Sequence, residues 1–122
     1  QLKFQVADVS KPLLAVKRIV EKGNHVGFWP GKRDSFIVNR KTGNKIFLRE
    51  NGRGSYMMDV NFVGGGRTQI TVDSGAEENV CPKLWGKEFG FESSFKPLNL
   101  RSASGNKIPH YGQREVIVES HF

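Results

Sequence analysis

One short stretch of this 122-residue chain carries residues of evident chemical use. The β-prone run Gln69–Val72 leads directly into Asp73, Ser74, Gly75 and Ala76. An apolar strand that ends this way delivers a carboxylate, a hydroxyl and a glycine into a tight turn. The same Asp-Ser-Gly sequence is also ordinary turn chemistry with no further role. The motif must therefore be weighed against the rest of the chain.

A second informative stretch follows about thirty residues later. Residues 100–112 contain Ser and Gly at their centre and end in Pro-His-Tyr-Gly, and the strand-like run Glu115–Val118 comes next. A strand into Asp-Ser-Gly-Ala followed by a glycine-tipped hairpin resembles the retropepsin-like aspartic proteases of retroviruses and retrotransposons. The resemblance implies that Asp73 is catalytic and that the hairpin is the flap that closes over substrate. The flap and substrate-binding residues would be Ser102, Ala103, Ser104 and Gly105.

The order of the segments suggests a circular permutation. In the family, the active-site strand is followed by the flap, a strand, and an apolar segment that enters a helix. Here the corresponding apolar segment, Pro12–Val16, and the strand before it, Phe4–Val6, precede Asp73. Joining Phe122 to Gln1 restores the family order. The single domain 1–122 thus resembles a permuted member, in which 1–62 correspond to the C-terminal half, 63–67 to a flexible glycine-rich connector, and 68–122 to the N-terminal half.

The chemistry of such a site requires two acids. Two close carboxylates that share one proton can activate a water and polarise a peptide carbonyl, because both cannot ionise readily. Asp8, Asp34 and Asp59 do not repeat the Asp-Ser-Gly turn. The second acid is therefore expected to be Asp73 of another copy, which makes a two-fold homodimer a requirement of the hypothesis.

The resemblance also implies roles for the residues after Asp73. Ser74 would hydrogen-bond across the dimer axis, and Gly75 would allow close backbone approach and offer its N–H to the carboxylate. Ala76 would keep the floor of the site small. The substrate would be an extended peptide, and polyprotein processing is the expected activity.

The pattern along the chain predicts an all-β domain, a small closed barrel with one short helix. Strands are expected around residues 2–6, 36–38, 46–48, 56–62, 69–72 and 116–118, and a short helical turn is expected within 82–89. The helix is expected to be capped by Ser10, to include Pro12 in its first turn and to end at Gly23. Its apolar face would contain Leu13, Val16 and Val20.

The charge of the chain leaves an alternative open. The net charge is +7, and residues 1–62 carry 12 Lys and Arg against 5 Asp and Glu, while residues 63–122 carry 7 of each. A basic half can mark contact with nucleic acid, but the basic residues are scattered and form no dense run, which favours a solvated basic face. The rival function is a non-catalytic basic β-barrel that binds nucleic acid or a peptide. A permuted dimer that has lost catalysis is the third possibility.

Several other classes of function are not indicated. No nucleotide or flavin motif is present, and His25 has no partner at metal-ligand spacing, so neither cofactor nor metal is expected. No run approaches the roughly 20 apolar residues of a membrane helix, and the first residues do not resemble a signal peptide. The lone Cys81, between Val80 and Pro82, is expected to be a buried structural thiol. An intracellular setting, in the cytoplasm or within a retroelement particle, follows as the expectation.

Overall fold

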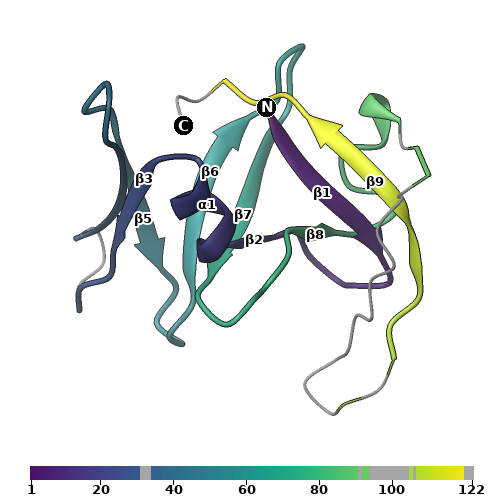
Figure 1. The fold of residues 1–122 in the computed structure, drawn as a ribbon, viewed down its shortest axis with the longest axis horizontal. Coiled ribbons are helices and arrows are strands. Elements are labelled where there is room, and N and C mark those ends of the chain that lie inside the picture. Colours follow the sequence, from purple (N-terminus) through teal and green to yellow (C-terminus); the bar gives the residue numbers. More distant parts are fainter. Residues whose placement is uncertain (31–33, 91, 94–104, 106, 120–122) are drawn as a thin grey trace.

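The computed structural model describes residues 1–30, 34–90, 92–93, 105 and 107–119 (Figure 1). The described residues form nine strands, one α-helix and one 3-10 turn. In chain order they are β1 (Leu2–Ala7), β2 (Leu13–Ala15), α1 (Val16–Glu21), β3 (Asn24–Gly27), β4 (Ser35–Asn39), β5 (Lys45–Glu50), β6 (Tyr56–Asn61), β7 (Arg67–Asp73), β8 (Val80–Cys81), η1 (Lys87–Phe89) and β9 (His110–Val116). The all-β class expected from the sequence is confirmed.

The sheet is open rather than closed. Its strands hydrogen-bond in the order β3-β4-β5-β6-β7-β2-β8-β1-β9. A barrel closes only when its two edge strands pair, and β3 and β9 lie at opposite ends of the molecule in Figure 1. The expectation of a closed barrel is corrected accordingly for the described strands.

The sheet nevertheless curls back on itself beyond β9. The Val63 N–H donates to the Ile117 carbonyl at 2.9 Å, and the Glu119 N–H donates to the Asn61 carbonyl at 2.8 Å. Phe62 and Val118 form an isolated antiparallel bridge between the same two segments. The end of the described chain is thereby fastened to the end of β6, even though the two edge strands, β3 and β9, do not pair with each other.

The core forms because alternate strand residues point to one side. Phe4 and Val6 of β1 and Ile70 of β7 are fully buried. The Trp85 ring packs edge-on against Phe4 with ring centroids 5.0 Å apart, and its indole N–H donates to the Thr68 hydroxyl at 2.8 Å. A large, partly buried ring with its polar group satisfied stabilises this end of the core.

The helix begins later than the sequence pattern predicts. Leu13, Leu14 and Ala15 form β2, and α1 spans only Val16–Glu21, with Ala15 rather than Ser10 at its N-cap position. Pairing with β7 supplies the backbone hydrogen bonds that a first helical turn would otherwise leave unmade. The predicted apolar face is partly wrong: Val16 does pack against the core, but Val20 is 51% exposed, and Ile19 is the buried residue of α1.

The glycine-rich residues 63–66 form a hairpin loop between β6 and β7. The Phe62 N–H donates to the Gly66 carbonyl at 2.8 Å, and the Gly65 N–H donates to the Phe62 carbonyl at 3.1 Å. Gly64, Gly65 and Gly66 all have φ between 93° and 115°, a region that other residues rarely adopt. The expected flexible connector is instead a hydrogen-bonded turn that sets the register of the two strands.

Candidate active site

Two strands that are distant in the sequence lie in parallel and end together at Asp73. β2 pairs with β7 in the register Leu13–Thr71, Leu14–Val72 and Ala15–Asp73. Leu14, Ala15 and Val72 are buried, so the last residues of both strands are held by the core. At this point β2 leads into α1 and β7 leads into the loop that starts at Ser74. The carboxylate of Asp73 is therefore presented at the end of a rigid strand, half-buried, rather than on a free loop.

The turn after Asp73 has the hydrogen bond that the resemblance implies. The Gly75 N–H donates to Asp73 Oδ1 at 2.8 Å. This bond also defines an Asx-turn, so the ordinary-turn interpretation accounts for it equally well. Ser74 and Gly75 are exposed and Ala76 is half-buried. A Cβ at Gly75 would lie 3.4 Å from Asp73 Oδ1, which is an ordinary contact distance, so within one chain the position accepts a methyl group.

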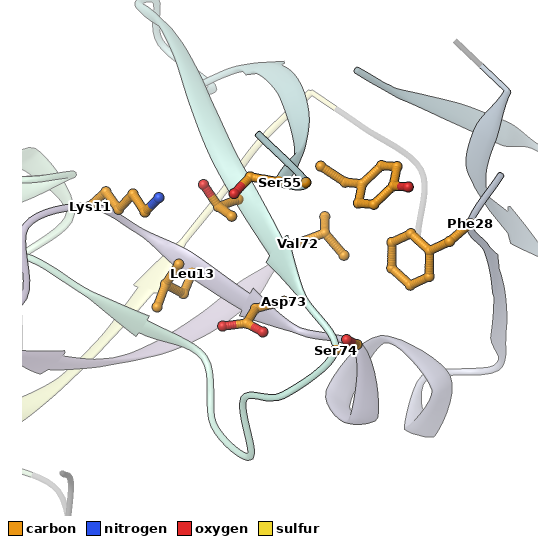
Figure 2. A pocket seen from close by; sticks show the side chains of 10 residues that line it. Lys11, Leu13, Phe28, Ser55, Val72, Asp73 and Ser74 are labelled. Carbon is orange, nitrogen blue, oxygen red and sulfur yellow. The ribbon is translucent and has the colours of Figure 1, made fainter. Parts of the chain in front are cut away.

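An open groove of about 500 Å³ runs past Asp73 (Figure 2). Leu13 and the Asp73 carboxylate lie on one side of β7 in this view, and Phe28 lies on the other. The Phe28 and Tyr56 rings are in contact, with centroids 4.7 Å apart. The groove thus offers an acid in its middle and an aromatic wall at one end. Its lining residues are Lys11, Leu13, Phe28, Gly54, Ser55, Tyr56, Thr71, Val72, Asp73 and Ser74.

The buried side chain of Asn79 links strands next to the one that carries Asp73. Asn79 is 7% exposed, its Oδ1 accepts from the Ala15 N–H at 2.8 Å, and its Nδ2 donates to the Lys3 carbonyl at 3.1 Å. The Asn79 carbonyl accepts from the Gln5 N–H at 2.8 Å. One residue thereby ties β1, β2 and β8 together, and Ala15 is the register partner of Asp73. Sequence reasoning missed Asn79; the available signal was a polar residue directly before the apolar pair Val80-Cys81.

An ion pair connects α1 to the loop that follows Asp73. The Arg18 guanidinium hydrogen-bonds to Glu21, at 2.9 Å, and to Glu78. The hydrogen bond with Glu21, together with that to Glu78, raises the pKa of Arg18 above its ordinary value, although partial burial opposes this. The charge of Arg18 is thus held in place between the helix and the loop.

The segment that follows β8 is fastened by a buried arginine. Arg114 on β9 is 2% exposed, and its guanidinium donates to the carbonyls of Gly90 at 2.6 Å, Lys83 at 3.1 Å and Pro82 at 3.4 Å, and to that of Trp85. Buried charges are stable only when hydrogen-bonded in this way. Arg114 was also missed from the sequence, because nothing local distinguishes it from an exposed arginine.

The cysteine is a structural residue, as expected. Cys81 is fully buried in β8, and burial raises the pKa of its thiol to about 11, while nearby Arg114 lowers it in part. A thiol that keeps its proton at neutral pH is a poor nucleophile. Cys81 is therefore a packing residue of the hydrophobic core.

The predicted flap lies mostly outside the described residues. Ser102, Ala103 and Ser104 belong to that part of the chain, and Gly105 is an exposed residue at a bend with φ of 86°. The strand after it begins earlier than expected: β9 starts at His110 and includes Gly112, whereas Val118 lies beyond it in a single bridge. The role of the flap stays a prediction.

The other aspartates considered do not lie beside Asp73. Asp59 is the register partner of Gln69, roughly 13 Å along β7 from Asp73 at the usual rise per residue, and it is paired with Arg49 at 3.1 Å. Asp8 is exposed, and its N–H donates to the Pro109 carbonyl next to β9. Asp34 is exposed just before β4. Neither Asp59 nor Asp8 is placed to be the second acid of a single-chain pair.

The described residues contain no group of three or more His, Cys, Asp and Glu side chains arranged to hold a metal ion. Within the same residues, no helix has the length and apolar character that crossing a bilayer requires. No protein-family model, curated protein or solved structure matches this chain. The function must therefore be argued from the geometry around Asp73.

Proposed function

We propose that this protein is a retropepsin-type aspartic endopeptidase, circularly permuted, in which two copies each contribute Asp73 to one active site. The observation that carries the proposal is the parallel pairing of β2 with β7. It brings the apolar strand before the helix beside the strand that ends in Asp73, although 57 residues separate Ala15 from Asp73 in the chain. The resemblance to the family requires these two strands to be adjacent. An ordinary Asp-Ser-Gly turn does not require it.

The reaction follows from two carboxylates that share one proton. The ionised Asp73 of one copy accepts a proton from water while the water oxygen attacks the peptide carbonyl carbon. The protonated Asp73 of the second copy donates its proton to the carbonyl oxygen. Collapse of the tetrahedral intermediate then breaks the C–N bond, and the amine leaves with a proton returned by the pair. Because the reaction needs one ionised and one protonated carboxyl group, activity is expected at mildly acidic pH.

The groove supports an extended peptide as the substrate. Its backbone would lie past Asp73, and its apolar side chains would contact Leu13 on one side and Phe28 and Tyr56 on the other. A groove with one central acid and aromatic walls suits a peptide with bulky apolar residues near the cleaved bond. Lys11, exposed at the rim, would favour an acidic residue farther from that bond.

The direct test is Asp73→Asn. The purified protein would be incubated at several pH values with a pool of random peptides, with and without a statine-type inhibitor, and products would be read by mass spectrometry. We expect inhibitor-sensitive cleavage that the Asp73→Asn variant loses by at least about a thousandfold, because neither proton transfer is possible. Asp8→Asn, an exposed acid outside the groove, is the matched control and should cleave normally. Inhibitor-sensitive cleavage that survives Asp73→Asn would overturn the assignment.

Mixing chains tests whether two copies share the site. If dimers form at random, an equal mixture of wild-type and Asp73→Asn chains has about one quarter of the activity of wild type at the same total concentration. A site complete within one chain would keep about half. Sedimentation of the same samples reports whether dimers are present, so loss of activity through failed association is distinguished from loss of the acid.

A further inference from the structure

The outer face of the β3–β4–β5 sheet is a second surface that the proposed protease site does not use. Side chains on these strands alternate between the core and the solvent. Asn24, Ser35, Ile37 and Leu48 are buried on the inner side. The opposite side, here named the β4–β5 face, consists of His25, Phe36, Val38, Lys45, Phe47 and Arg49, all exposed or half-buried. This sheet forms one end of the molecule (Figure 1, left).

Two aromatic rings lie side by side on this face. Phe36 and Phe47 are direct register partners across β4 and β5, and Phe47 is 60% exposed. Phe36 lies over Gly27 of β3, where any Cβ would be 2.9 Å from the ring tip. Because Gly27 has no side chain, the Phe36 ring can settle against the sheet. The result is a shallow aromatic platform on a flat strand surface.

The platform carries positive charge. The Lys45 ammonium lies 4.5 Å from the Phe36 ring centroid and 5.8 Å from that of Phe47. Arg40 and Lys41 are exposed in the turn that joins β4 to β5, and His25 is exposed on the neighbouring strand.

The acids near this surface are partly neutralised. Asp59 is paired with Arg49, and the Glu50 carboxylate accepts the N–H groups of Gly52 at 2.8 Å and Gly54 at 2.9 Å. Asp34 is exposed at the start of β4. The free charge beside the two rings is therefore mainly positive.

We propose that the β4–β5 face binds single-stranded nucleic acid, with bases stacked on Phe47 and Phe36 and phosphates held by Lys45 and the basic turn at Arg40 and Lys41. Rings on a sheet surface stack with any base, and adjacent cations follow the backbone. A duplex hides its base faces, so it cannot use the rings. Lys45 can leave the rings for a phosphate because its side chain is long and exposed.

The test uses fluorescein-labelled 12-nucleotide oligo(dT) and oligo(U), measured by fluorescence anisotropy at 50 and 200 mM salt. We expect Kd values of about 1 to 100 µM at the higher salt, and tighter binding at the lower. Phe47→Ala should raise Kd about tenfold at both salt concentrations. Lys45→Ala should weaken binding. It should also reduce the slope of the logarithm of the affinity against the logarithm of the salt concentration by about one. Asp73→Asn should bind like wild type, so the test is independent of the protease proposal.

Matched variants elsewhere give the control. Leu84, which is 78% exposed in the loop after β8, and Lys87 of η1 can each be changed to alanine, with binding expected to stay within about twofold of wild type. Circular dichroism of each variant reports whether it is folded.

Three results would overturn the proposal. Equal affinity for a 12-base-pair duplex, or binding unaffected by Phe47→Ala, would mean that charge alone attracts the polymer. Concentration-dependent dimers that Phe47→Ala dissociates would mean that a second copy of the chain covers this face.

Discussion

The strands from β7 to β9 and the exposed turns of the β3–β4–β5 sheet use polar side chains in opposite ways. In the first region, Asn79, next to the strand that pairs with the Asp73 strand, and Arg114, on the edge strand β9, are buried and hydrogen-bond to backbone groups that are far away in the sequence. In the β3–β4–β5 sheet and its turns, Asn39, Glu50 and Asn51 bond to backbone N–H groups two to four residues away, and these bonds are exposed.

The difference shows where the structure depends on individual residues. A buried donor or acceptor that loses its partner has no water to replace it, whereas an exposed one does. The strands that carry Asp73 should therefore be sensitive to single polar substitutions. The exposed turns and the outer face of the β3–β4–β5 sheet should tolerate them, although its buried Asn24 and Ser35 should not. The outer face is free to carry a binding surface.

The largest contrast is expected between two arginines. Arg114→Met leaves several buried carbonyls without a donor and should lower the free energy of unfolding by about 3 to 4 kcal/mol. Arg49→Met removes an exposed ion pair with Asp59, at 3.1 Å, and should cost less than about 1 kcal/mol. Urea unfolding followed by tryptophan fluorescence measures both. Equal losses would contradict the contrast between the regions.

Two asparagines give the next contrast. Asn79→Ala removes the bonds to Ala15 and Lys3 and should cost about 2 to 3 kcal/mol. Asn51→Ala removes bonds in the exposed β5–β6 turn and should cost about 0.5 kcal/mol. Under the proposed function, Asn79→Ala should also lower kcat while the protein is still folded, since Ala15 lies beside Asp73. An Asn79→Ala protein with unchanged stability would show that this brace is dispensable.

The stability of the protein at alkaline pH tests whether water reaches the buried thiol of Cys81. Burial raises the pKa of Cys81 from its ordinary value of 9.0 to about 11. The folded state therefore holds this proton more tightly than the unfolded state, and the resulting stability is complete below about pH 9 and is lost as the pH rises towards 11. Wild type should lose about 2 kcal/mol more than Cys81→Ala between pH 8 and 10.5, measured by urea unfolding. Parallel pH profiles of the two proteins would mean that water reaches the thiol.

The smallest effect is expected on the β4–β5 face. Phe47 is 60% exposed, so Phe47→Ser should change the free energy of unfolding by less than about 0.5 kcal/mol. Gly27→Ala is the informative companion, because its Cβ would press on the Phe36 ring, which must then move. The melting temperatures of the two variants compare the loss of the exposed Phe47 ring with the displacement of the Phe36 ring that packs against Gly27. A large loss in Phe47→Ser would show that this face contributes to the fold rather than standing apart from it.

Local patterns predicted most strands and failed where distant segments meet. The alternation of Leu2, Phe4 and Val6 gave β1 correctly, and the strands expected at 36–38 and 46–48 fall within β4 and β5. Leu13 was assigned to a helix because its spacing to Val16 and Val20 fits a helical period. The structure pairs it with Thr71 instead, and a pairing across nearly sixty residues leaves no mark on local periodicity.

The candidate site divides in the same way. Residue types alone identified Asp73 as an acid at the end of a strand, because strand and turn preferences act over a few neighbours. The bond from the Gly75 N–H to Asp73 was implied by the family resemblance. Burial of Asn79 and Arg114, the late start of α1 and the open edges of the sheet depended on which distant segments came into contact. Such contacts form through the collective packing of the whole chain, so the surroundings of Asp73 emerge only once β1, β2, β7 and β8 lie side by side.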